Sequence, residues 1–265
     1  MHAQEIIITP ELAAEWMKFN VGNRNLPKGN AKYYSELIRR GEFLTTHQAL
    51  AFTGSPSSPG RLLDGQTRLT AVMDTGIPIK QWVFWGAPEI TFKAIDGGKP
   101  RSFVDHNPEF TKRTISVVNV FWTLCHSGFP IKITKTDADK IWGVFGHHYE
   151  TLLEKCAVNE KSLSNSTVKA AFCWCMHQNP DSAQDIADAY RNLVLKRIEN
   201  LPVSANRLFV KLIGVMGGGW ENTRLQFYYT HKAITPSNWS LQKIYGPDEE
   251  YYKALAINLK SAAGL

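Results

Sequence analysis

The stretch Leu62-Leu63-Asp64-Gly65-Gln66-Thr67-Arg68-Leu69-Thr70-Ala71 indicates how the first part of the chain folds. A very short apolar run precedes Gly65, and the apolar residues after Arg68 keep a helical spacing that stops at Gly76. Glycine permits a tight turn between a strand and a helix. The amides after Gly65 then point outward at the helix start, where the partial positive charge favours a phosphate. The stretch therefore predicts a strand, a phosphate-binding turn and a helix.

Two charged side chains of this turn carry the expected chemistry. Arg68 lies three residues after the glycine and can close over a bound anion with a two-pronged hydrogen bond. Asp64 is the first choice of catalytic carboxylate, ahead of Glu36 and Asp96, and Arg68 is the other candidate catalytic residue. The alternative is structural: an ordinary turn with a surface arginine, and an aspartate that caps the helix.

Strand and helix signals alternate on both sides of this stretch. Residues 5–8, 43–52 and 77–85 are strand-like, whereas residues 9–19 and 30–40 have helical signals. After about residue 105 the signals become helical, over residues 112–125, 137–156, 166–178, 181–198, 205–215, 220–231 and 249–261. We therefore expect an α/β domain over residues 1–105 and an all-α domain over residues 106–265.

The arrangement around the turn resembles a known family. An Asn/Arg-containing loop, a Tyr-Tyr-x-x-Leu-Ile helix at 33–38, a strand, and Asp-Gly-Gln-x-Arg-x-x-Ala from Asp64 follow one another, with a further strand behind them. Over about residues 5–104 the chain is similar to the N-terminal domain of the ParB/sulfiredoxin superfamily. Within this superfamily, its sequence is most similar to the branch of DGQHR-type proteins, which includes DndB-like proteins, and to ParB-like proteins of phages. The resemblance implies a ParB/sulfiredoxin-like α/β domain in a protein related to phages or mobile elements.

Ligand roles follow from this resemblance. In the family, a Gly-x-x-Arg loop at a helix start holds nucleotide phosphates, and residues 65–68 match that loop. A second family loop, which ends in Arg, makes another phosphate contact, and Asn23 and Arg24 look like its counterpart. The resemblance thus implies a nucleoside triphosphate, ATP or CTP, with Mg²⁺, bound by Gly65, Gln66, Thr67, Arg68, Asn23 and Arg24.

The motif also departs from individual branches of the family. Thr67 stands where the DGQHR motif has His, which argues against a role that needs an imidazole. Gln66 stands where sulfiredoxins have Cys, which argues against reduction of a sulfinic acid. The Glu-Arg-Arg that follows the glycine in partitioning ParB proteins is missing, so the resemblance does not imply CTP clamping.

The charge of the chain is basic, with a formal net charge of +6 over 265 residues. Residues 1–110 carry 12 basic and 11 acidic side chains, whereas residues 111–265 carry 18 and 13. A basic surplus of this size fits a nucleic-acid partner. It is also common in ordinary soluble domains, in which the basic side chains are solvated and the aromatic side chains form the core. Four basic candidates for nucleic-acid contact lie in the C-terminal part among aromatic residues suited to base stacking: Arg207, Lys211, Arg224 and Lys232. Lys99 and Arg101, in the Asp-Gly-Gly-Lys-Pro-Arg turn at 96–101, are two further basic candidates.

Several protein classes do not fit the sequence. The most apolar stretch, residues 115–124, is about half the length of a membrane span. The N-terminus lacks the basic and apolar regions of a signal peptide, so we expect a cytoplasmic protein. The four cysteines are expected to be thiols, and the Cys-x-Cys of Cys173 and Cys175 predicts a buried core helix, because two such thiols diverge by about 200° around a helix.

Three functions remain open on this evidence. The first is a nucleotide-dependent hydrolase or phosphotransferase acting on or near DNA, with phosphates held at the glycine turn. The second is a non-catalytic DNA-binding regulator or host-defence inhibitor, and the third is a metal-dependent nuclease that uses Asp64. Nucleotide and DNA are the expected partners and a membrane is not, while the sequence leaves the oligomeric state open, a dimer included.

Overall fold

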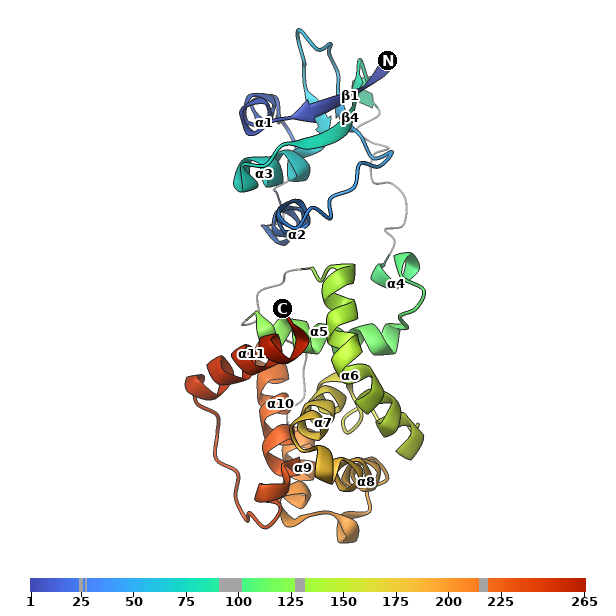
Figure 1. Cartoon of the computed structure of the whole chain (residues 1–265), viewed down its shortest axis with the longest axis vertical. Helices are drawn as coiled ribbons and strands as arrows, with labels where there is room; N and C mark the ends of the chain where they lie inside the picture. Colours follow the sequence, from blue (N-terminus) through green and yellow to red (C-terminus); the bar gives the residue numbers. More distant parts are fainter. Residues whose placement is uncertain (24–25, 27, 91–101, 127–131, 215–218) are drawn as a thin grey trace. The chain divides into compact units, whose positions relative to one another are not determined.

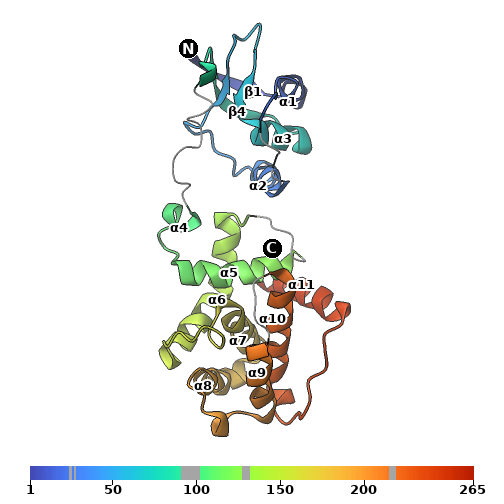
Figure 2. The ribbon, with the colours of Figure 1, turned by 180° about the vertical axis from the view of Figure 1, so that it is seen from behind.

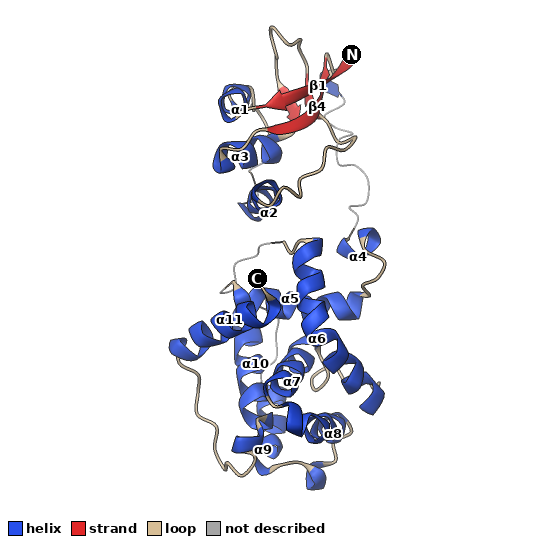
Figure 3. Cartoon of the chain, viewed as in Figure 1, coloured by secondary structure: helices blue, strands red, loops and turns tan. Residues whose placement is uncertain are grey.

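The computed structural model describes residues 1–23, 26, 28–90, 102–126, 132–214 and 219–265. The chain divides into two compact units, unit 1 of Met1–Ser102 with Pro130–Thr134, and unit 2 of Phe103–Phe129 with Lys135–Leu265. Among the described residues, the strands lie in unit 1, while unit 2 is helical (Figure 3). An α/β part followed by a helical part is therefore confirmed.

Unit 1 is built on a four-stranded mixed sheet with the order β1-β4-β2-β3 (Figure 1). β4 runs antiparallel to β1 and parallel to β2, and β3 runs antiparallel to β2. This arrangement places the end of β3, where the glycine turn begins, at one edge of the sheet. The strands are β1 (His2–Ile8), β2 (Leu50–Phe52), β3 (Leu62–Asp64) and β4 (Ile79–Trp85).

α1 (Pro10–Met17) and α2 (Lys28–Arg39) both pack against α3 (Gln66–Thr75), and residues of the three helices join those of the strands in one core (Figures 1 and 2). α1 begins where expected, because the Thr9 hydroxyl accepts a hydrogen bond of 3.2 Å from the Leu12 N–H. The centre of the core is aromatic: Phe52 stacks on Trp85 at 4.9 Å between ring centroids, and Trp16 meets both rings edge-on.

Unit 2 is organised around α7 (Ser166–Gln178), which packs against α5, α6, α8 and α10. Every residue from Thr167 to Met176 is buried, and this run contains Cys173 and Cys175. The four cysteines are free and buried, which confirms the prediction of a core helix with buried thiols. The other helices are α4 (Phe103–His106), α5 (Lys112–Cys125), α6 (Lys135–Lys155), α8 (Ala183–Val194), α9 (Val203–Gly214), α10 (Trp220–Ile234) and α11 (Glu249–Ala263), with short η2 (Pro180–Ser182), η3 (Ile198–Asn200) and η4 (Pro236–Asn238).

The strand expected over residues 43–52 is wrong in extent, because only Leu50–Phe52 forms β2. The carbonyls just before it belong to Gln48 and Ala49, and both accept hydrogen bonds from the Arg68 guanidinium. The Arg68 side chain therefore bonds two backbone carbonyls that a longer strand would use for hydrogen bonds to a neighbouring strand.

The helix expected over residues 181–198 is also wrong in extent. The structure has η2 followed by α8, which ends at Val194. Lys196 then adopts a left-handed conformation with φ 58°, and the Arg197 N–H donates back to the Asn192 carbonyl at 2.8 Å. This hydrogen bond closes the helix end in the way that glycine more often does.

No helix in the described part of the chain is long and apolar enough to cross a membrane.

Candidate functional site

The glycine turn, residues 65–68, joins β3 to α3 as the sequence predicts. Gly65 is the N-cap of α3 with φ 115° and ψ 0°, and its carbonyl accepts the N–H groups of Arg68 and Leu69 at 3.0 Å each. A Cβ at this position would lie 2.5 Å from Cγ of Leu50. Backbone geometry and packing therefore both require glycine, and the first N–H groups of α3, which include that of Thr67, point out of the helix end.

Arg68 is turned inward. Its side chain is only 9% exposed, and the guanidinium donates to the carbonyl oxygens of Gln48 and Ala49, the latter at 3.1 Å. The same group donates to Oδ2 of Asp64 at 3.3 Å. Arg68 thus joins the start of β2 to the end of β3, and both terminal nitrogens of its guanidinium donate to groups of the protein itself. Direct binding of an anion by Arg68 stays a prediction. It would require the guanidinium to exchange some of these hydrogen bonds for bonds to the anion.

Asp64 remains the carboxylate nearest the turn. It is the last residue of β3, and its side chain is 45% exposed while one oxygen accepts from Arg68. The weaker candidate Glu36 lies on α2, in ion pairs with Arg39 at 2.8 Å and Arg40 at 3.9 Å. Asp96 lies outside the described residues.

Asn23 and Gln66 are brought together by a third residue, Asn20, that the sequence analysis did not single out. The Asn20 amide donates to Oε1 of Gln66 at 3.2 Å and accepts from the Asn23 amide at 2.5 Å. Asn23 also donates to the Leu62 carbonyl at 2.9 Å. The three amides, called the amide chain below, run from the first loop to the start of α3. Only the Asn20-x-x-Asn23 spacing in a turn-rich loop signals this chain in the sequence.

A second missed residue, Arg61, fixes the same loop from its other side. Its guanidinium donates to the Val21 carbonyl at 2.8 Å and pairs with Glu89 at 2.7 Å. The Leu62 N–H donates to the Phe19 carbonyl at 2.9 Å. The loop that resembles the second phosphate loop of the family therefore lies against β3, next to the glycine turn. Arg24 of that loop is outside the described residues.

Four of the six basic candidates lie within the described residues. Lys99 and Arg101 lie outside the described residues, whereas Arg207 and Lys211 are exposed on α9. The Lys211 ammonium sits 5.0 Å from the centre of the Tyr229 ring. On α10, Arg224 is paired with Glu249 at 2.9 Å, and the Lys232 ammonium sits 5.4 Å from the centre of the Tyr251 ring.

The strongest pKa shifts belong to side chains in the core of unit 2. His231 is held between α7 and α11, with Nε2 2.8 Å from the Gln178 amide oxygen and Nδ1 2.8 Å from the Tyr251 hydroxyl. Burial lowers the pKa of His231 to about 4. Burial also lowers the pKa of His148 to about 4, with smaller contributions from His147 and His177. Within the described part of the chain, no three His, Cys, Asp or Glu side chains are grouped so that they could hold a metal ion.

No protein-family model matches the chain, and no similarity to a curated protein or to a solved structure was found. The ParB/sulfiredoxin resemblance therefore rests on the motif residues themselves.

Proposed function

We propose that the chain is a nucleotide-binding protein of ParB/sulfiredoxin-like type, with the phosphates held at the glycine turn. The nucleotide would be hydrolysed, or its phosphoryl group transferred, on or near DNA. One observation carries the proposal: the amide chain ends at the first residue of α3, where the N-terminus of that helix favours negative charge.

The residues of the turn take separate roles in this proposal. The N–H groups at the start of α3 and the Asn20 amide would donate to phosphate oxygens, while the Asn23 amide, which donates to Asn20 and to the Leu62 carbonyl, would position Asn20. Asp64 would orient the attacking group or hold Mg²⁺, because a carboxylate oxygen is a ligand that this ion prefers. Arg68 would support the turn from within, since it is bound to Gln48 and Ala49. This assigns Arg68 a positioning role in place of direct phosphate contact.

A negative charge introduced by Thr67→Glu tests the phosphate site with little risk to folding. Thr67 is half-buried in the first turn of α3, and a glutamate there stabilises a helix N-terminus by about 0.3–1 kcal/mol. The same carboxylate repels a phosphate at that place. Met73→Glu is the matched control, because it adds the same charge to the exposed side of α3 roughly 9 Å along the helix axis.

The measurement is calorimetric titration with ATP, ADP, CTP and GTP, with and without Mg²⁺. We expect saturable binding to the wild type and to Met73→Glu, and a loss of affinity of at least about tenfold in Thr67→Glu. Equal affinities in the two variants would exclude the turn as the phosphate site. Thermal unfolding of each variant without nucleotide shows that the fold is retained.

A second function, a DNA-binding regulator without catalysis, is favoured by the surface of α9. Arg207 and Lys211 are exposed four residues apart, so they lie on one face of the helix, with the Tyr229 ring under the Lys211 ammonium. Basic side chains beside an aromatic ring suit a nucleic-acid backbone and its bases. In this case Arg207→Glu and Lys211→Glu weaken DNA binding, the affinity falls steeply with salt, and added nucleotide has no effect.

A further inference from the structure

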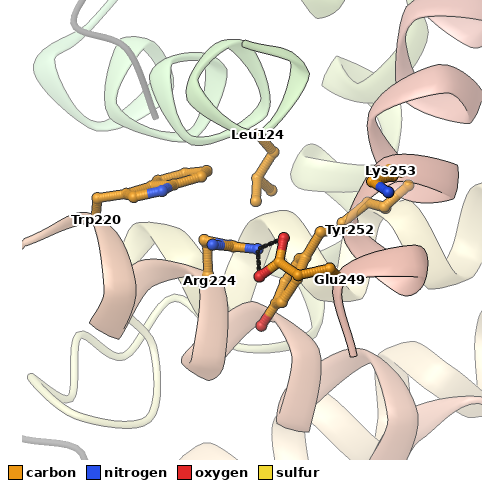
Figure 4. Close-up of a pocket in the computed structure, with 7 residues that line it drawn as sticks. Leu124, Trp220, Arg224, Glu249, Tyr252 and Lys253 are labelled. Carbon is orange, nitrogen blue, oxygen red and sulfur yellow. Dashed lines mark hydrogen bonds and ion pairs between the residues drawn. The ribbon is translucent and has the colours of Figure 1, made fainter. Parts of the chain in front are cut away.

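A pocket of about 230 Å³ lies in unit 2, between α5, α10 and the first turns of α11. Its floor is apolar, because Leu124 and Leu255 are both buried. Figure 4 shows the indole of Trp220 on one side of the pocket, Leu124 pointing into it, and Tyr252 and Glu249 on the opposite side. The volume suits one small ring system rather than an extended chain.

One wall of the pocket is an ion pair between Arg224 and Glu249. The Arg224 guanidinium donates to both carboxylate oxygens of Glu249, at 2.9 and 3.0 Å (Figure 4). Its plane is held by the Tyr252 ring, whose centre is 3.8 Å away, and Trp220 lies farther off at 5.5 Å. A guanidinium offers donors and a carboxylate offers acceptors, so this wall presents both kinds of group side by side.

Two polar groups of the residues that line the pocket make no hydrogen bond within the described part of the protein. Among the described residues, Nε of Arg224 and the hydroxyl of Tyr252 are buried and have no hydrogen-bond partner. Buried polar groups are nearly always paired, so two unpaired ones in residues that line the same pocket leave the wall with polar groups that a ligand or a water molecule could satisfy.

The charge around the pocket disfavours an anion. Arg224 faces two carboxylates, Glu249 at 2.9 Å and Glu221 at 3.5 Å, and Lys253 is paired with Glu250 at 2.7 Å. The Tyr252 ring already holds the Arg224 cation at 3.8 Å from its centre, which disfavours a second cation at that ring. An uncharged ligand is left as the best fit.

We propose that this pocket binds an uncharged nitrogen heterocycle of nucleobase type, stacked on Trp220 with its polar edge against Arg224 and Glu249. A nucleobase has a flat face for stacking, and its edge carries both donors and acceptors. This site lies in unit 2, whereas the glycine turn lies in unit 1. It binds the base by stacking on the ring and makes no contact with a phosphate.

Binding of nucleosides to the full chain tests this proposal. Adenosine, guanosine, cytidine and uridine are titrated by calorimetry, together with their 5′-monophosphates and with arginine amide as a cationic probe. Trp220→Leu removes the stacking face while keeping an apolar side chain. Trp82→Leu is the matched control, because it removes an exposed indole from unit 1. Glu249→Gln keeps the size of the wall residue and changes the polar edge.

The proposal predicts that at least one nucleoside binds at a single site, and that its monophosphate binds no more tightly. Trp220→Leu should weaken that binding by about tenfold or more, while Trp82→Leu changes it by less than about twofold. Glu249→Gln should change the preference among the four bases. The proposal is overturned if no nucleoside saturates, if both tryptophan variants bind alike, or if only arginine amide binds. Binding that needs the phosphate and disappears in Thr67→Glu would instead assign the ligand to the glycine turn.

Discussion

Arg68 has a buried guanidinium that bonds two backbone carbonyls and one carboxylate. Arg68→Ala leaves the Ala49 carbonyl without its donor and Asp64 without its ion partner. We expect a loss of about 2–4 kcal/mol in the free energy of unfolding, measured by urea denaturation. Asp64→Asn should cost less than about 1 kcal/mol, because that side chain is half-exposed. Full stability of Arg68→Ala with loss of nucleotide binding would show that the guanidinium serves the ligand.

Gly65 has a positive φ and no room for a side chain. Gly65→Ala places a methyl group against Leu50 and strains the backbone, so its cost should exceed about 2 kcal/mol. Gly76 at the other end of α3 also has a positive φ, of 68°, but open space around it. Gly76→Ala should therefore cost only about 1 kcal/mol. Urea denaturation measures both variants, and equal costs would contradict the close packing at Gly65.

At the scale of elements, burial within unit 2 should make the four thiols of the chain unreactive. Burial raises the pKa of Cys175 and that of Cys125 on α5 to about 12, and it also raises the pKa of Cys173. The thiolate is the reactive form, so we expect no fast reaction of the native protein with DTNB, and reaction of all four thiols in denaturant. Ser57→Cys, on an exposed turn, is the positive control. Rapid native reaction of any original cysteine would contradict the packing of these helices.

The elements also show what could be predicted from the sequence. α5 and α7 have the bounds that their periodicity predicts, because local capping and apolar spacing define both. β2 is shorter than predicted because Arg68, 19 residues away from Ala49, binds the carbonyls before it. The inward turn of Arg68 and the role of Asn20 depend on such distant partners, and neither leaves a local signal. The place of the glycine turn was therefore predictable, and the contacts of its arginine were not.

At the scale of the whole molecule, stability should depend on pH through His148 and His231. Their pKa values fall from 6.5 to about 4 on folding, so the unfolded chain binds more protons between these limits. Stability is therefore complete above about pH 6.5 and falls as the pH drops toward 4, by up to about 1.4 kcal/mol per pH unit for each histidine. Urea denaturation at several pH values measures this slope.

A variant of one histidine isolates its contribution. His231→Gln keeps a polar group toward Gln178 and removes the titration, so the acid slope should become shallower while neutral stability also falls. His47→Gln, at an exposed position in unit 1, should leave the slope unchanged. An unchanged slope in His231→Gln would contradict the neutral, buried state of that imidazole.

The central claim is that the start of α3 binds the phosphates of a nucleotide, and one titration tests it most directly. Wild type, Thr67→Glu and Met73→Glu are titrated with ATP, ADP, CTP and GTP, with and without Mg²⁺. The account predicts saturable binding of at least one nucleotide, lost in Thr67→Glu and kept in Met73→Glu. The absence of binding to the wild type, or binding that Thr67→Glu leaves unchanged, would contradict it.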